Sequence, residues 1–182
     1  MAALRGHASS VALSVEEDLD DIVHMVETVQ PDVLHLCGDI ERVPPDAVAH
    51  LRDRLPGVQI MQAVPVTGPE SVEVALAFAP HCDLLLLDSD APEIDGIGAT
   101  GHTHDWNVSR AIVEAVELPV ILAGGLSPDN VAEAIERVRP WGVDSLSHTN
   151  RRNADGGFSK DLELVERFVA AARAASAVPA AD

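Results

Sequence analysis

The sequence predicts an α/β fold in which helices cover a set of parallel strands. Short apolar runs alternate with amphipathic stretches along the 182 residues, the pattern of parallel strands joined by helical crossovers. The strand candidates are nearly continuous apolar runs, as expected for strands buried beneath helices. No linker divides the chain, so residues 1–182 are predicted to form a single βα domain. These features fit either a doubly wound open sheet or a (β/α) barrel.

Each predicted strand is followed by a predicted helix, which gives six strand–helix units. The strands are predicted at 10–15, 32–39, 58–66, 83–90, 119–125 and 142–147, and the helices at 16–30, 44–56, 68–80, 105–116, 127–139 and about 160–174. Ser127 and Pro128 are expected to be the N-cap and first residue of the fifth helix. The tail, residues 175–182, is expected to be disordered. Six units fall short of the eight of a complete barrel, which typically takes about 250 residues.

Composition limits the classes of partner. Twelve basic and thirty acidic side chains give a net charge of −18, which repels nucleic acid and anionic membranes. Backbone N–H groups can still bind a small anionic substrate locally. No apolar run reaches membrane-spanning length, the start lacks a signal-peptide pattern, and Cys37 and Cys82 do not suggest a disulfide framework. We therefore expect a cytoplasmic protein.

The carboxyl ends of the predicted strands carry the candidate site, because ligands bind there in both architectures. Asp88 ends a run of four leucines, where partial desolvation would raise its pKa and suit it to general acid catalysis. Gly124 and Gly125 lie between a strand and a helix, where backbone can approach a phosphate. Ser147 and His148 follow the next strand, and a barrel commonly binds phosphate after its last two strands.

The histidines raise a second possibility, a divalent metal site. His35 and Cys37 lie two apart on one strand and so face the same side. Metal ligation could also involve residues after later strands: Asp88, His102, His104 and His148. No compact metal motif supports this possibility, and we predict no metal and no organic cofactor.

Five motifs in order resemble those of phosphoribosylanthranilate isomerases of tryptophan biosynthesis. They are LHLCGD, LLLLDSD, GATGHTHDW, ILAGGLSPDNVAEAIERVRPWGVDSLS and GGFSKDLELVERFV. The resemblance implies a TIM (β/α)8-barrel fold, here an incomplete barrel of about six units corresponding to strands 3 to 8. It also implies an Amadori rearrangement, the intramolecular aldose–ketose isomerisation of a phosphorylated ribosyl amine, without a cofactor.

The resemblance also assigns roles to individual residues. Asp88 takes the place of the general acid, and Gly124, Gly125, Ser147 and His148 take the place of the phosphate-binding loops. Gly101, in a loop that looks like the one closing over substrate, and Asp144 complete the predicted substrate-binding set.

The chain departs from the family pattern at several positions. Nothing matches the cysteine of the first strand that serves the family as general base. Cys37 stands where the family usually has histidine. The general base is then absent or borrowed, and Cys37 or His35 could serve only in a rearranged pocket. His102 replaces the usual lysine, His104 a phenylalanine, and His148 a glycine.

These departures leave two alternatives to an active isomerase. One is a non-catalytic phosphosugar-binding paralogue, and the other is a metal-dependent lyase or hydrolase on the same barrel. The six units also lead us to expect either preceding strand–helix units in a longer chain or a homo-oligomer that covers the open edges.

Overall fold

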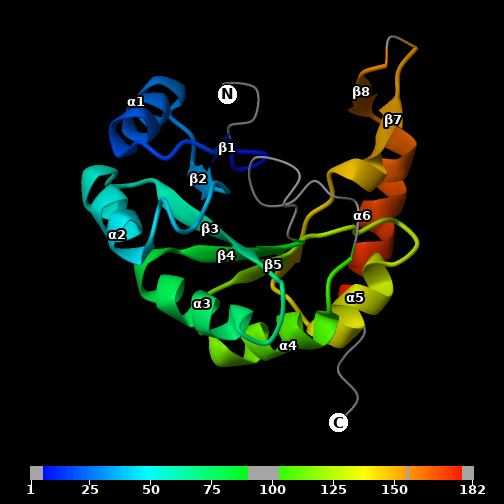
Figure 1. The fold of residues 1–182 in the computed structure, drawn as a ribbon. Coiled ribbons are helices and arrows are strands. Elements are labelled where there is room, and N and C mark those ends of the chain that lie inside the picture. The colour runs from blue at the N-terminus through cyan, green and yellow to red at the C-terminus, as the bar shows by residue number, and fades with distance from the viewer. Residues whose placement is uncertain (1–5, 90–102, 155, 178–182) are drawn as a thin grey trace.

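A six-stranded parallel sheet forms the centre of the computed structural model, which describes residues 6–89, 103–154 and 156–177. Its strands lie in chain order from β1 to β6, and every neighbouring pair is parallel. The sheet is curved, and helices follow its outer side (Figure 1). A doubly wound sheet would reverse its strand order at a switch point. The strand order therefore confirms the partial (β/α) barrel and excludes the doubly wound alternative.

All six predicted strand–helix units are present. The strands are β1 (Val11–Ser14), β2 (Val33–Leu36), β3 (Gln59–Pro65), β4 (Leu84–Asp88), β5 (Val120–Leu122) and β6 (Gly142–Val143). The helices are α1 (Leu19–Val29), α2 (Pro45–Arg54), α3 (Ser71–Phe78), α4 (Trp106–Ala115), α5 (Val131–Val138) and α6 (Leu162–Ser176). Among the described residues, no helix is long and apolar enough to cross a membrane.

Two apolar layers follow from the alternation of side chains along the strands. The larger layer lies between sheet and helices and includes Leu34, Ile60, Leu85 and Leu122. The smaller layer is built from residues of the opposite parity, on the inner face of the curved sheet: Val33, Cys37, Met61, Ala63, Leu84, Leu86 and Ala123. The sequence predicted that His35 and Cys37 face the same side of the strand. The structure confirms this prediction, because Cys37 belongs to the inner layer and His35 aligns with Met61 of the same layer.

The inner face is open at β1. Val11, Leu13 and Val15 are 51%, 60% and 47% exposed, although they lie in or directly after a strand. Leu13 aligns with His35, so its side chain points to the inner face. Among the described residues β1 pairs only with β2, so the first strand presents apolar side chains and a backbone edge without a second strand partner from that part of the chain.

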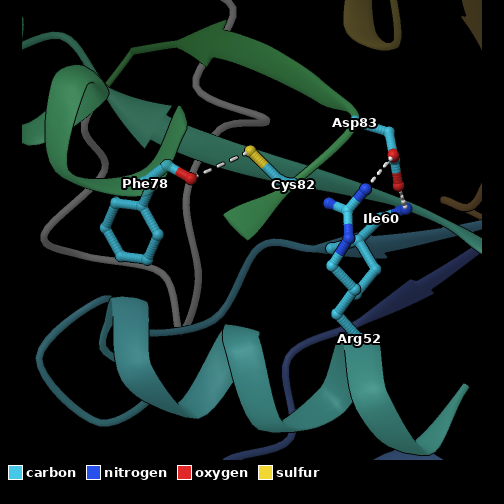
Figure 2. Close-up of polar contacts among 5 residues, drawn as sticks. All are labelled: Arg52, Ile60, Phe78, Cys82 and Asp83. Carbon is cyan, nitrogen blue, oxygen red and sulfur yellow. Dashed lines mark hydrogen bonds and ion pairs between the residues drawn. The ribbon is translucent and has the colours of Figure 1, made fainter. Parts of the chain in front are cut away.

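The amino-terminal end of the strands is held by a small polar cluster (Figure 2). The Arg52 guanidinium of α2 forms an ion pair with the Asp83 carboxylate at 2.7 Å. The second oxygen of Asp83 accepts a hydrogen bond from the Ile60 amide of β3 at 2.8 Å. The Cys82 thiol donates to the carbonyl of Phe78 at the end of α3. One carboxylate therefore links β3, β4 and α2.

Three local predictions require correction. Helix α5 begins at Val131 rather than after Ser127, because Ser127 to Asn130 form a separate turn. The segment predicted as a loop before the last helix contains an antiparallel hairpin, β7 (Asn150–Arg152) with β8 (Phe158–Lys160). Helix α6 runs to Ser176, so the predicted disorder is wrong for residues 175 and 176, while 178–182 lie outside the described residues.

Candidate active site

A pocket at the carboxyl end of the strands brings most of the predicted site together. Its lining comes from the end of β4, the turn after β5 and the segment after β6. Six predicted residues are part of that lining: Asp88, Gly124, Gly125, Asp144, Ser147 and His148. The predicted substrate-binding residue Gly101 lies outside the described residues.

Register explains why the two carboxylates meet at this pocket. Asp88 pairs with Pro65, and the Ala123 and Asp144 amides donate to the carbonyls of Leu87 and Leu122. Asp88, Ala123 and Asp144 therefore form one row across β4 and the ends of β5 and β6. Strands are about 4.8 Å apart, so the backbones of the two aspartates are about 10 Å apart.

The half-buried carboxyl of Asp88 has the properties of a general acid near neutral pH. Burial raises its pKa to about 6, and the nearby charge of Asp144 adds to this rise. The Ser89 amide opposes the rise by donating to Oδ1 at 2.7 Å. A pKa close to the working pH leaves a usable protonated fraction for proton donation.

Asp144 lines the same pocket as Asp88. Its side chain keeps accessible surface, but the surrounding protein still raises its pKa by desolvation. The Lys160 ammonium and the Ser145 amide act in the opposite direction. A pocket bordered by two carboxylates needs such compensation before it can accept a phosphate.

The Gly124–Gly125 turn has a backbone that only glycine adopts without strain. Both φ angles are positive, 78° and 63°. A Cβ on Gly124 would lie 2.6 Å from Ser89 Oγ and 2.7 Å from His104 Nδ1. The turn is therefore packed directly against the residue that follows Asp88.

Polar bonds fix this turn from two sides. The Asn130 side chain accepts from the Ser127 amide at 2.7 Å and donates to the Gly125 carbonyl at 3.1 Å. The Ser145 hydroxyl donates to the Leu126 carbonyl at 2.6 Å. The loops after β5 and β6 thus form one connected wall of the pocket.

His104 has a structural position that the sequence did not reveal. Its Nε2 lies 2.7 Å from the Ser109 hydroxyl of α4, and its Nδ1 lies 3.3 Å from the Ser89 hydroxyl. Burial lowers the pKa of His104 to about 4, so the ring is neutral at pH 7. Both ring nitrogens contact serine hydroxyls, which argues against the metal-ligand role considered for His104.

Cys37 faces the same interior as Asp88 but lacks the chemistry of a base. The residue is buried, and desolvation together with the Asp88 charge raises the pKa of its thiol to about 11. A thiol with that pKa is protonated at neutral pH and is not a proton acceptor. The assignment of Cys37 as substitute base is therefore not favoured by its surroundings.

The other proposed metal ligands do not converge. Within the described residues there is no group of three or more histidine, cysteine or acidic side chains placed to hold a metal ion. His35 is largely buried, and burial lowers its pKa to about 4. His102, the remaining candidate ligand, lies outside the described residues.

Comparison with known proteins agrees with this fold. The family described as N-(5'-phosphoribosyl)anthranilate isomerase matches residues 2–171. The isomerase of Methanocella arvoryzae is 40% identical over 149 residues, covering 82% of this chain and 65% of that protein. The isomerase of Haloferax volcanii is 40% identical over 174 residues, covering 96% and 72%. The chain thus spans about two thirds of the length of these relatives.

A solved structure extends the comparison to three dimensions. A phosphoribosylanthranilate isomerase in complex with reduced 1-(o-carboxyphenylamino)-1-deoxyribulose 5-phosphate superposes with a TM-score of 0.73 at 25% identity, covering 95% of this chain and 75% of that chain. On sequence and structure together, the chain belongs to the N-(5'-phosphoribosyl)anthranilate isomerase family.

Proposed function

We propose that this protein isomerises N-(5'-phosphoribosyl)anthranilate, or a closely similar phosphorylated ribosyl amine, to the corresponding ketose. The observation that carries the proposal is one pocket that combines the Asp88 carboxyl with the Gly124–Gly125 turn and the segment from Ser145 to His148. An acid of pKa about 6 faces backbone groups suited to a phosphate. The bound ligand of the solved relative is itself a phosphorylated ribulose derivative.

Asp88 acts at the first step of the proposed reaction. Its proton passes to the ribose ring oxygen as the bond between that oxygen and the anomeric carbon breaks. The amine nitrogen supplies the electron pair and becomes the imine nitrogen. The neighbouring carbon C2 then loses its proton to a general base, which gives an enolamine. The former anomeric carbon gains a proton and the C2 hydroxyl loses one, which gives the amino ketose. Cys37 is not suited to remove the proton from C2, because its thiol has a pKa of about 11.

Turnover can be tested directly, because the anthranilate substrate is fluorescent and its signal falls as the product forms. We expect purified protein to accelerate this loss in buffer containing a chelator. Activity that disappears with the chelator and returns with a divalent metal would instead support the metal-dependent lyase or hydrolase. No acceleration at any enzyme concentration would overturn the isomerase proposal.

A non-catalytic phosphosugar-binding protein is the second candidate. This candidate is favoured by the state of Cys37. The chain has no match for the family's cysteine base, and the buried, protonated thiol of Cys37 is not suited to replace it. The reduced ketose phosphate bound by the solved relative is a suitable probe. Tight binding of this analogue without turnover of the substrate would favour the binding role.

We further propose that a second copy of the chain covers the open inner face at β1. Val11, Leu13 and Val15 would lose their exposed apolar surface in such a contact. We expect light scattering to show a dimer or larger assembly that Leu13→Ser weakens. A monodisperse wild-type monomer with cooperative melting would contradict this proposal.

The cytoplasm is the compartment that we propose for this activity. The expected partner is a small phosphorylated sugar rather than nucleic acid or a membrane, in keeping with the net charge of −18. Cell fractionation with the protein in the membrane pellet would contradict this location.

A further inference from the structure

Lys160 donates three hydrogen bonds to the segment from Ser145 to Thr149, most of which lines the pocket. It is the only lysine of the chain and belongs to β8, in the hairpin that precedes α6. Its ammonium donates to the Thr149 hydroxyl at 2.8 Å and to the carbonyls of Leu146 and Ser145 at 3.1 Å and 3.4 Å. An ammonium has three N–H donors, so these contacts use its full capacity.

The Thr149 hydroxyl donates to the same carbonyls of Ser145 and Leu146, at 3.0 Å and 3.2 Å, so Lys160 and Thr149 together hold the orientation of two peptide units of the pocket wall. The described residues contain no cis peptide bonds, and in a planar trans peptide the N–H points opposite to the C=O. Because the carbonyls of Ser145 and Leu146 point toward Lys160, the N–H groups of Leu146 and Ser147 point away from it. Both residues line the pocket, so we infer that these amide donors are available to a ligand bound there.

The charge of Lys160 also acts on the pocket. The pocket contains two acidic side chains, and the ammonium favours the ionised form of one of them, Asp144. A phosphate entering the pocket would meet repulsion from ionised Asp88 and Asp144. A cation within reach of the same loop offsets part of this repulsion and polarises the peptide units that would donate to the phosphate.

We propose that Lys160 is the positioning residue of an anion-binding loop, acting on a substrate phosphate through the Ser145–Ser147 backbone rather than by direct contact. The inference deepens the proposed function, since it concerns the phosphate group of that substrate. It also predicts binding of inorganic phosphate alone, which does not depend on any isomerase chemistry.

The test compares Lys160→Met with Arg151→Gln. Arg151 is on the partner strand β7 and bonds to the Ser159 hydroxyl at 3.2 Å, so its substitution removes one positive charge from the same hairpin without breaking a bond to the pocket loop. The dissociation constant of inorganic phosphate is measured by calorimetry for both variants and wild type. Thermal melting and circular dichroism report whether each variant is folded.

We expect Lys160→Met to weaken phosphate binding on the order of tenfold, and Arg151→Gln by less than about twofold. Lys160→Arg keeps the charge but cannot converge on three acceptors in the same way, so intermediate affinity is expected. If Lys160→Met does not fold, Lys160→Arg carries the comparison with Arg151→Gln, because it keeps the Thr149 hydroxyl, which itself donates to the Ser145 and Leu146 carbonyls at 3.0 Å and 3.2 Å. Equal affinity in wild type and the Lys160 variants, equal losses in both hairpin variants, or no binding by wild type would overturn the inference.

Kinetics separate this inference from the proposed function. With an active wild-type enzyme, Lys160→Met should raise KM for the phosphorylated substrate by a larger factor than it lowers kcat. A lowered kcat with unchanged KM would contradict the positioning role while leaving the isomerase assignment intact. Phosphate binding that depends on Lys160 in a protein without turnover would support the inference and count against the isomerase.

Discussion

Strand β4 has an aspartate at each end, and the two carboxylates have opposite surroundings. Asp83, before the strand, receives the Arg52 guanidinium at 2.7 Å and the Ile60 amide at 2.8 Å (Figure 2). Asp88, at the end of the strand, is bonded by the amide of its neighbour Ser89 and lies near another carboxylate, Asp144. The first carboxylate connects three elements, whereas the second has a raised pKa and faces a pocket. In a βα barrel, the carboxyl ends of the strands carry the chemistry and the amino ends the stability.

The strongest test of this contrast compares how replacement of each aspartate changes kcat. Asp88→Asn cannot donate the carboxyl proton, so we expect kcat to fall about 10²- to 10⁴-fold. Asp83→Ala lies at the other end of the strand and should change kcat by less than about twofold. The fluorescence assay measures both. Equal losses of kcat in the two variants would remove the distinction between the two ends.

The raised pKa of Asp88 should also make the free energy of unfolding depend on pH. The Asp88 pKa is raised from 3.8 to about 6 in the folded state, so the folded state binds more protons than the unfolded state between these values. Its ionisation therefore lowers the free energy of unfolding as pH rises from about 4 to about 6. Asp88→Asn should gain stability relative to wild type across this window, as measured by urea titration at several pH values. A stability difference independent of pH would contradict the raised pKa.

A smaller effect is expected at the glycine turn of the pocket. Gly124→Ala forces a side chain at φ 78° and also brings Cβ within 2.7 Å of Ser89 Oγ and His104 Nδ1. We expect a loss of about 1–3 kcal/mol in the free energy of unfolding, with weaker phosphate binding. Gly57→Ala is the matched control, because Gly57 has φ 90° with nothing within 4 Å of the added Cβ. Equal destabilisation would show that strain in the backbone, rather than packing against the site, explains the requirement for glycine.

The smallest effect concerns the stabilising cluster at the amino-terminal end. Asp83→Ala removes an ion pair to a half-exposed arginine and one hydrogen bond to backbone. We expect a loss of about 1 kcal/mol in the free energy of unfolding, because exposed ion pairs contribute little. Chemical denaturation measures this value, with Asp53→Ala, which follows Arg52 in α2, as the control. A loss no larger than that of the control would contradict the structural role of Asp83.

The sequence predicted the order of elements because each strand is a buried apolar run followed by an amphipathic helix. It also predicted Asp88 and the glycine turn, since both stand directly at strand ends. The β7–β8 hairpin was missed because its three-residue strands carry little apolar pattern. The start of α5 was misplaced because Ser127 and Pro128 resemble an N-cap, while Asn130 fixes a separate turn there.

Long-range contacts account for the features of the site that the sequence did not reveal. Lys160 reaches a loop 11 to 15 residues earlier, and the sequence marked it only as the single lysine of the chain within the motif GGFSKDLELVERFV. His104 connects Ser89 with Ser109 across two elements. Burial of Cys37 against its neighbours and the charge of Asp88 set a thiol pKa that no local pattern in the sequence encodes.

The central claim is that Asp88 donates a proton to a substrate held in the pocket, and the pH dependence of single-turnover rates tests it most directly. Since the carboxyl must be protonated to act, and its pKa is about 6, the wild-type rate should be highest below pH 6 and fall about tenfold per pH unit above pH 7. Asp88→Asn should show a low rate without this dependence. A wild-type rate that is constant or rises between pH 6 and pH 8 would contradict the account.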